Sequence, residues 1–142
     1  QTVIEVGVHS PKQCIDAAEL GYDTHCFEPS PPSYNRIKRG VDKTLPKTRE
    51  MVHIYNTAVV GATSGQTISI HSTGGTGDHV GEYDMWQMKK RFERTSDADV
   101  KKRGTIVHVP TVRLDDFIAG DSIDGDKVFL LKVDTQGFEP SI

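Results

Sequence analysis

A glycine between a β-rich segment and a helix start is the first feature of the sequence that could bind a ligand. It lies in Glu5-Val6-Gly7-Val8-His9-Ser10, after a predicted strand and just before Pro11. A glycine lets the backbone approach a ligand closely, and a helix N-terminus presents N–H groups and a partial positive charge. We therefore expect Glu5, Gly7, Val8, His9 and Ser10 to form one side of a site for an anionic group.

Two acidic side chains follow predicted strands elsewhere in the chain. Glu28 ends the second strand, twenty-one positions beyond Gly7. A carboxylate at this point can accept hydrogen bonds from both hydroxyls of a ribose, and the expected offset is about twenty residues. Asp134 follows the apolar segment Lys127 to Val133, which we expect to be a central strand.

Each of these features has a simpler interpretation when taken alone. A glycine after a strand is often only a turn residue, Glu28 before a proline could be a solvated boundary, and Asp134 could cap the next helix. Together they are more informative, because open α/β sheets bind ligands outside the carboxyl ends of their strands. The sequence predicts that Gly7, Glu28 and Asp134 meet at this edge.

The first forty residues contain the elements that would position this edge. Thr2 to Val6 predicts a strand, and Ser10 with Gln13 has the form of a capping box that starts a helix running to about Leu20. Gly21 is suited to a left-handed cap, Tyr22 to Phe27 predicts a second strand, and a second helix starts after Ser30 and stops at Gly40. This alternation is typical of βαβ units with a parallel sheet.

The remaining elements are less regular, and we expect one domain over residues 1–142. The predicted strands are Val52 to Val60, Gln66 to His71, Thr105 to Val109 and Lys127 to Val133. The predicted helices are Tyr83 to Arg94 and Leu114 to Ala119, and a glycine-rich loop covers Ser72 to Gly81. The fold class is α/β, with a Rossmann-like open and mostly parallel sheet.

Composition excludes several classes of function. A net charge of −3 argues against a general affinity for nucleic acid, and the longest apolar run, Val128 to Leu131, is too short to span a bilayer. Cys14 and Cys26 lie twelve positions apart without a metal-binding motif, so we expect two buried thiols. The compartment stays open: cytoplasmic, or membrane-associated if a leader or anchor precedes Gln1.

Five segments in order resemble the signatures of FkbM-type methyltransferases. They are Val3-Ile4-Glu5-Val6-Gly7, Phe27-Glu28-Pro29-Ser30-Pro31, Asn56-Thr57-Ala58-Val59 with Gly65 beyond it, Val109 to Phe117, and Leu131-Lys132-Val133-Asp134-Thr135-Gln136-Gly137-Phe138-Glu139. The resemblance implies a seven-stranded fold of the class I methyltransferase type. It also implies S-adenosylmethionine as cofactor and transfer of a methyl group to a hydroxyl of a sugar, glycan or other small molecule.

The resemblance also implies roles for individual positions. Glu5 and Gly7 would line the methionine end of the cofactor, whose carboxylate would face the helix start at Val8, His9 and Ser10. Glu28 would bind the ribose, and Asp134 would lie near the reacting methyl group as cofactor contact and catalytic residue. The cofactor set is completed by Pro29, Ser30, Asn56 and Ala58. The family's final strands would lie beyond Ile142, so the domain is expected to be truncated on its C-terminal side.

Four positions depart from the family pattern and keep a second interpretation open, the first being Glu5, where the family usually has Asp. The family usually has Asn at the His9 position and Gly at the Pro11 position, and Pro11 lacks the N–H that an anion site would use. Gln136 stands where many members have Glu, and a neutral amide cannot act as a general base. A Rossmann-like binding domain without methyl transfer is therefore the alternative.

Other functions are less well supported by the sequence. A dinucleotide-dependent dehydrogenase should have three glycines after the first strand, whereas Gly7 is followed by Val8, His9, Ser10 and Pro11. The basic residues 89–91, 94 and 101–103 are typical of a solvated surface rather than a nucleic-acid site. Asp115, Asp116 and Asp134 could hold Mg²⁺, but Asp115-Asp116 is better explained as a helix cap, so no metal is expected.

Overall fold

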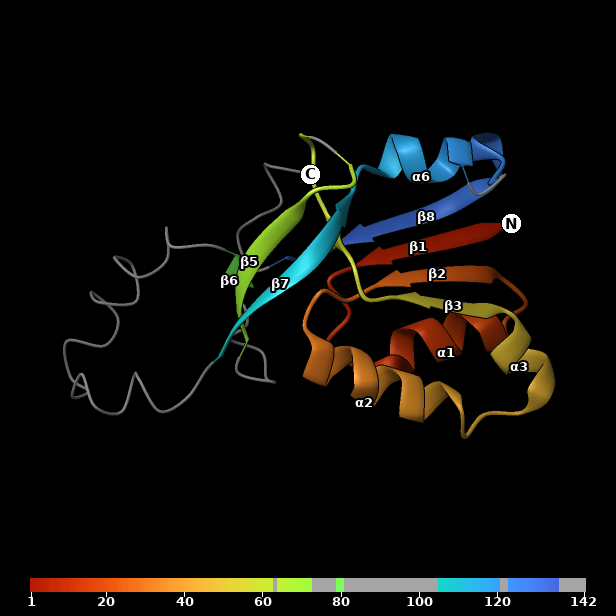
Figure 1. Ribbon diagram of the computed structural model, residues 1–142. Coiled ribbons are helices and arrows are strands. Elements are labelled where there is room, and N and C mark those ends of the chain that lie inside the picture. The colour runs from red at the N-terminus through yellow and green to blue at the C-terminus, as the bar shows by residue number, and fades with distance from the viewer. Residues whose placement is uncertain (63, 73–78, 81–104, 121–122, 136–142) are drawn as a thin grey trace.

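The computed structural model describes residues 1–62, 64–72, 79–80, 105–120 and 123–135 (Figure 1). The helix expected at Tyr83 to Arg94, the basic residues around it, most of the glycine-rich loop and Gln136 lie outside these residues. Among the helices of the described part, none is long and apolar enough to cross a membrane.

Four parallel strands form the main sheet, in the order β3-β2-β1-β8. They are β1 (Thr2–Val6), β2 (Asp23–Phe27), β3 (Val52–Tyr55) and β8 (Val128–Val133). Helices α1 (Pro11–Glu19), α2 (Pro31–Val41) and α3 (Pro46–Glu50) lie on one face, and α6 (Leu114–Gly120) lies on the other (Figure 1). The predicted α/β fold with a mostly parallel sheet is confirmed at this level.

A second, mixed sheet has the order β4-β7-β5-β6. It contains β4 (Ala58–Val59), β5 (Thr67–Ser72), β6 (His79–Val80) and β7 (Thr105–Val112). β7 is parallel to β4 and antiparallel to β5. A 3-10 turn, η1 (Gly125–Lys127), then leads into β8 and is capped by the Asp124 carboxylate, which accepts from the N–H of Asp126.

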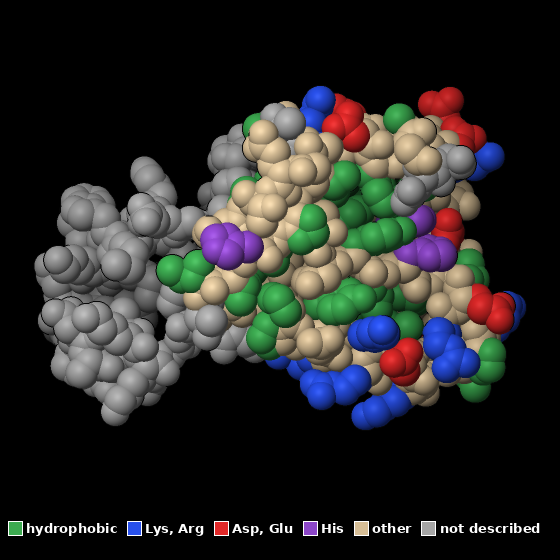
Figure 2. All heavy atoms as spheres, viewed as in Figure 1, with side chains coloured by type: hydrophobic (Ala, Val, Ile, Leu, Met, Phe, Trp, Pro, Cys, Tyr) green, Lys and Arg blue, Asp and Glu red, His purple; other side chains and the backbone are tan. Residues whose placement is uncertain are grey.

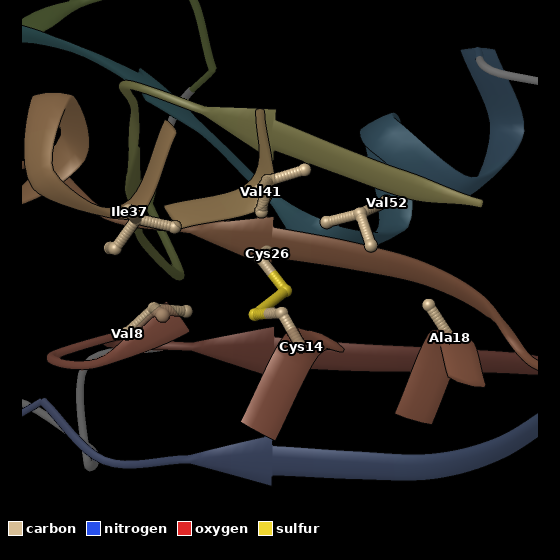
Figure 3. Close-up of a cluster of buried hydrophobic side chains, with 7 residues drawn as sticks. All are labelled: Val8, Cys14, Ala18, Cys26, Ile37, Val41 and Val52. Atoms are coloured by element: carbon tan, nitrogen blue, oxygen red, sulfur yellow. A yellow bond between two sulfur atoms is a disulfide. The ribbon is translucent and has the colours of Figure 1, made fainter. Parts of the chain in front are cut away.

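Hydrophobic residues fill both faces of the main sheet. Figure 3 shows the cluster between the sheet and α1 to α3, made of Val8, Cys14, Ala18, Cys26, Ile37, Val41 and Val52. The opposite face packs Ile4, Val6 and Phe27 against Phe117 of α6. All five residues of β1 are buried, which is consistent with its position between β2 and β8 in the sheet.

The expectation of two buried thiols is wrong. Cys14 of α1 and Cys26 of β2 are fully buried, but they form a disulfide between α1 and the sheet. Their Cα atoms lie 6.6 Å apart. The spacing of the two residues gave no sign of this pairing, because it depends on how α1 packs across β2.

The stop predicted at Gly40 is also displaced. Helix α2 continues to Val41, and its cap residue is Asp42. A Cβ on Gly40 would lie 2.7 Å from Cγ and 2.9 Å from Cβ of Pro11, so a side chain at this position would collide with the start of α1. Gly40 therefore allows α1 and α2 to pack closely, and it does not end α2.

Two strand predictions also need correction. Val52 to Val60 is not one strand, because the chain leaves the main sheet after Tyr55 and joins the second sheet at Ala58. β8 is not central in the described part of the chain, where its one strand neighbour is β1. Its apolar residues Phe129, Leu130 and Leu131 are 59%, 50% and 48% exposed.

Candidate functional site

The strands of the main sheet end in register at their carboxyl ends. Val6 of β1 pairs with both Phe27 of β2 and Val133 of β8, and Phe27 also pairs with Tyr55 of β3. The residues that follow these strands, Gly7, Glu28, Asn56 and Asp134, therefore start from one edge. The prediction that Gly7, Glu28 and Asp134 meet at this edge of the sheet is confirmed, while their roles stay predictions.

Gly7 is held between the ends of β2 and β8. Its φ of 83° lies in the left-handed region, and an added Cβ would lie 1.9 Å from the carbonyl oxygen of Asp134. The N–H groups of Gly7 and Val8 both donate to the carbonyl oxygen of Phe27, at 3.0 and 3.3 Å. Residue 7 must therefore be glycine because the backbone of Asp134 lies so close to it. The N–H groups of Gly7 and Val8 already have an acceptor within the protein.

Glu5 is a buried carboxylate on the α1 side of the sheet. Its Oε1 accepts a hydrogen bond of 2.8 Å from Lys132 Nζ, and its Oε2 lies 3.3 Å from Cys14 Sγ. Burial raises the pKa of Glu5, while the hydrogen bond and positive charge of Lys132 act against this rise and the negative charge of Asp134 adds to it. Lys132 also donates to Gln13 Oε1 at 3.2 Å, which links β1, α1 and β8 beside the turn.

The start of α1 differs in detail from the predicted capping box. Ser10 is the N-cap, but its Oγ accepts from the N–H of Lys12 at 3.4 Å, and Gln13 instead contacts Lys132. Arg36 of α2 donates to the carbonyl oxygen of His9 at 3.0 Å. Among the hydrogen bonds of the described residues, none uses the N–H of His9 or Ser10. These two groups remain as donors for an anion in front of α1.

Glu28 is held by its own loop. It is buried, and its Oε1 accepts a hydrogen bond of 2.8 Å from the N–H of Ser30. Asn56 donates through Nδ2 to the carbonyl oxygens of Glu28 and Pro29, at 3.0 and 2.9 Å. Asn56 thereby joins the ends of β2 and β3 and fixes the backbone at Glu28 and Pro29.

Ser30 does not cap α2 through its side chain, although the helix begins at Pro31 as expected. Its fully buried Oγ instead lies 2.9 Å from Oγ of Ser72, at the end of β5. This contact crosses forty-two positions of the sequence and ties the Glu28 loop to the second sheet.

The remaining predicted site residues differ in exposure. Val8 and Ala58 have buried side chains in hydrophobic clusters, so only their backbones could contact a cofactor. The Asp134 side chain is 56% exposed, and its Oδ2 lies 3.8 Å from Lys132 Nζ. Its backbone N–H donates to the carbonyl oxygen of Val6 at 2.9 Å, which anchors the residue at the edge while its carboxylate faces solvent.

Sequence reasoning missed three residues that organise this edge: Lys132, Arg36 and Ser72. Lys132 had a local signal, because it lies two positions before Asp134 on an otherwise apolar strand. Arg36 and Ser72 had none, since each contacts its partner across a loop or between sheets. The Asp115-Asp116 cap is also corrected: α6 starts at Leu114, so both lie in its first turn, with Asp115 paired to Arg113 and Asp116 accepting from Ser64.

A comparison with protein-family models matches residues 5–142 to the methyltransferase FkbM domain. The chain belongs to this family. The match covers nearly the whole chain and includes the glycine turn, Glu28 and Asp134, so the resemblance of the five sequence segments is confirmed. Neither a curated protein nor a solved structure matched the chain.

Membership supports a methyltransferase, and a methyl donor at this edge would need particular polar groups. A nucleoside with an amino-acid group needs acceptors for its ribose and donors for its carboxylate. The carboxylate of Glu28 at the end of β2 and the N–H groups of His9 and Ser10 before α1 provide this chemistry. These polar groups therefore fit such a methyl donor. Fewer amides are available in front of α1 than the sequence suggested, because Pro11 has no N–H and the N–H groups of Gly7 and Val8 donate to the Phe27 carbonyl.

Proposed function

We propose that this methyltransferase uses S-adenosylmethionine and transfers its methyl group to a hydroxyl of a sugar, glycan or other small molecule. The observation that carries the proposal is the common edge formed by Gly7, Glu28 and Asp134 after β1, β2 and β8. In a parallel α/β sheet this edge is where ligands bind. The type of acceptor follows from the family resemblance alone.

The proposed cofactor site has a methionine end and a ribose end. Glu5, Gly7, Val8, His9 and Ser10 would line the first, with the N–H groups of His9 and Ser10 as its donors. Glu28, Pro29, Ser30, Asn56 and Ala58 would hold the second, with the Glu28 carboxylate accepting hydrogen bonds from ribose hydroxyls. The contacts of Asn56 and Ser30 support this role because they immobilise the Glu28 loop before any ligand binds.

S-adenosylmethionine supplies a methyl group that is already activated by a sulfonium. The protein must therefore orient the acceptor oxygen in line with the methyl group and remove its proton. Asp134 is suited to the second task because its carboxylate is exposed at the edge and can accept a proton from a hydroxyl. Lys132 Nζ lies 3.8 Å from that carboxylate, so the two side chains meet at the same edge.

Calorimetry with S-adenosylmethionine tests the cofactor. The whole protein should bind it, and Glu28→Gln should weaken binding at least tenfold, because an amide replaces a carboxylate that accepts hydrogen bonds from the ribose. Glu19→Gln, at the exposed end of α1, is the matched control and should bind normally. No detectable binding by the folded whole protein would remove the basis of the proposal.

Transfer of radiolabelled methyl groups to a panel of hexoses and glycosides tests the reaction. Asp134→Asn should reduce kcat by about 10²- to 10⁴-fold, the usual contribution of a general base, while the Kd for S-adenosylmethionine changes less than tenfold. Asp126→Asn, which changes an exposed carboxylate outside this edge, should leave kcat unchanged. An equal kcat for Asp134→Asn and the parent protein would exclude Asp134 as the base.

A binding domain without methyl transfer is the second candidate. It is favoured by Pro11, which lacks an N–H at the first position of α1, and by the use of the Gly7 and Val8 amides within the protein. Binding of S-adenosylmethionine without turnover on any acceptor of the panel would support this candidate.

A further inference from the structure

Two histidines and an aspartate lie together on the main sheet, away from its carboxyl edge. Asp23 and His25 are alternate residues of β2, and His53 of β3 is the register partner of His25. All three therefore share one face of the sheet, on the α6 side, where His25 packs edge-on against Phe117. Figure 2 shows histidine and acidic side chains meeting at the surface below α6. We call these three residues the β2–β3 cluster.

The potential ligand atoms of the β2–β3 cluster are close to one another. His53 Nε2 lies 2.9 Å from Asp23 Oδ1, and His25 Nε2 lies 3.3 Å from Asp23 Oδ2. One ligand atom from each residue can be chosen so that all three lie within 4.8 Å of one another. Ligands around a tetrahedral Zn²⁺ at 2.0–2.1 Å are roughly 3.3 Å apart, which is close to the two distances between Asp23 and the histidine nitrogens.

The hydroxyl group of Tyr55 holds the His25 ring in its orientation. Its Nδ1 lies 2.9 Å from the hydroxyl oxygen of Tyr55, and its ring is buried. Histidine ligands of metals usually donate their second ring N–H to an oxygen, which fixes the tautomer and directs the other nitrogen at the metal. Without an ion, His25 Nε2–H can donate to the Asp23 carboxylate. With an ion bound, donation from Nδ1 to Tyr55 would direct the Nε2 lone pair towards the ion between Asp23 and His53.

The other two residues have the freedom that binding requires. The side chains of Asp23 and His53 are 49% and 43% exposed, so an ion can enter from solvent and water can complete its coordination. The His53 ring stacks on that of His25, with centroids 4.7 Å apart and planes inclined by 23°. Because ring lone pairs lie in the ring plane, the exposed His53 ring has to tilt out of this stack when the ion binds.

We propose that the β2–β3 cluster binds a divalent transition-metal ion, with Zn²⁺ as the best match. Two imidazole nitrogens and one carboxylate are ligands that Zn²⁺ prefers, with water in a fourth position. The ion would join β2 to β3 and neutralise the carboxylate shared by the two histidines. This inference is independent of the methyl-transfer proposal, because the cluster starts at the amino end of β2, whereas Glu28 follows its carboxyl end.

Titration calorimetry of the whole protein with ZnCl₂, at pH 7.5 and without reductant, tests the proposal. Without reductant Cys14 and Cys26 stay in their disulfide and offer no thiolate. We expect one Zn²⁺ per chain, and Co²⁺ at the same site should give the visible absorption of a four-coordinate ion. His53→Ala and Asp23→Asn should each weaken Zn²⁺ binding at least tenfold. Both side chains are about half exposed, so we expect both variants to fold.

Two further variants distinguish a built site from chance binding. Tyr55→Phe should weaken Zn²⁺ binding about tenfold through the orientation of His25. His108→Ala is the matched control: His108 is an exposed strand histidine beside Ser69, and its loss should leave Zn²⁺ binding unchanged. Absence of binding, or binding that His53→Ala and Asp23→Asn leave intact, would overturn the proposal.

Discussion

The carbonyl oxygen of Asp134 lies only 1.9 Å from the position that a Cβ on Gly7 would occupy. The loops after β1 and β8 are therefore in direct backbone contact, and the residue proposed as the methyl-transfer base rests against the glycine turn. The N–H of Asp134 donates to the carbonyl oxygen of Val6 and completes this junction. The position of Asp134 depends on residue 7 having no side chain.

Gly7→Ala should therefore disrupt both stability and cofactor binding. We expect a loss of about 2–4 kcal/mol in the free energy of unfolding, from the left-handed φ and the displacement of Asp134. Gly21→Ala is the control, because Gly21 has a φ of 92° but no atom within 4 Å of an added Cβ. It should lose only about 1–2 kcal/mol. Equal losses in urea unfolding would show that the contact with Asp134 does not matter.

Gly40→Ala should destabilise the protein even though alanine normally stabilises a helix by about 1 kcal/mol. The added Cβ would overlap the Pro11 ring, and such overpacking costs about 1–3 kcal/mol. The double variant Pro11→Ala/Gly40→Ala should recover part of the loss, because the ring is removed. Gly120→Ala, where an added Cβ meets open space, should be neutral or stabilising. A gain in thermal stability for Gly40→Ala would contradict the α1–α2 contact.

The buried carboxylate of Glu5 should make stability depend on pH in a defined direction. Burial raises its pKa above 4.5 in the folded protein, so the folded state retains a proton that the unfolded state has lost. Stability therefore falls as pH rises through the window between 4.5 and the raised pKa, with a slope of at most about 1.4 kcal/mol per pH unit.

Glutamine at position 5 does not titrate, so the Glu5→Gln variant lacks this loss of stability. The free energy of unfolding of the variant relative to the parent protein should therefore increase as pH rises above 4.5. Loss of the Lys132 contact adds an offset that varies little with pH, because Lys132 is one-third exposed and can be solvated. Urea unfolding at several pH values measures the difference, and Glu19→Gln should show no such trend. A pH-independent difference for Glu5→Gln would be incompatible with a raised Glu5 pKa.

Reduction of the Cys14–Cys26 disulfide should destabilise the protein without changing its fold. Closure of a loop of this length restricts the unfolded chain by about 3 kcal/mol, so we expect a loss of about 2–3 kcal/mol in reductant. Urea unfolding with and without reductant checks this, and the variant Cys14→Ser/Cys26→Ser should be insensitive to reductant. Identical curves for the parent protein in both conditions would argue against the disulfide.

Much of the N-terminal half was predictable because its signals are local. The strand Thr2–Val6, the helix after Ser10, the left-handed Gly21 and the strand ending at Phe27 all follow from residue type and spacing within a few positions. The common edge of Gly7, Glu28 and Asp134 was also predictable, because parallel strands joined by helices must all end on the same side.

The errors concern contacts between segments that are distant in the sequence. The disulfide depends on the packing of α1 across β2, and Gly40 on the approach of Pro11. The break after Tyr55 depends on the pairing of Ala58 with Thr111 in a second sheet. In each case the two partners lie in different helices or strands, so the periodicity and capping signals of one element carry no information about the contact.

The sequence by itself determined the fold class, the family and the residue types available at the carboxyl edge. Only the tertiary structure decided how these residues are used: that Gly7 accommodates Asp134, that Lys132 donates to Glu5, and that Asn56 holds the Glu28 loop. It also brought Asp23, His25 and His53 together, because side chains on neighbouring strands meet only when strand register is set. Register is a property of the packed sheet, and it is fixed by burial on both faces rather than by either strand alone.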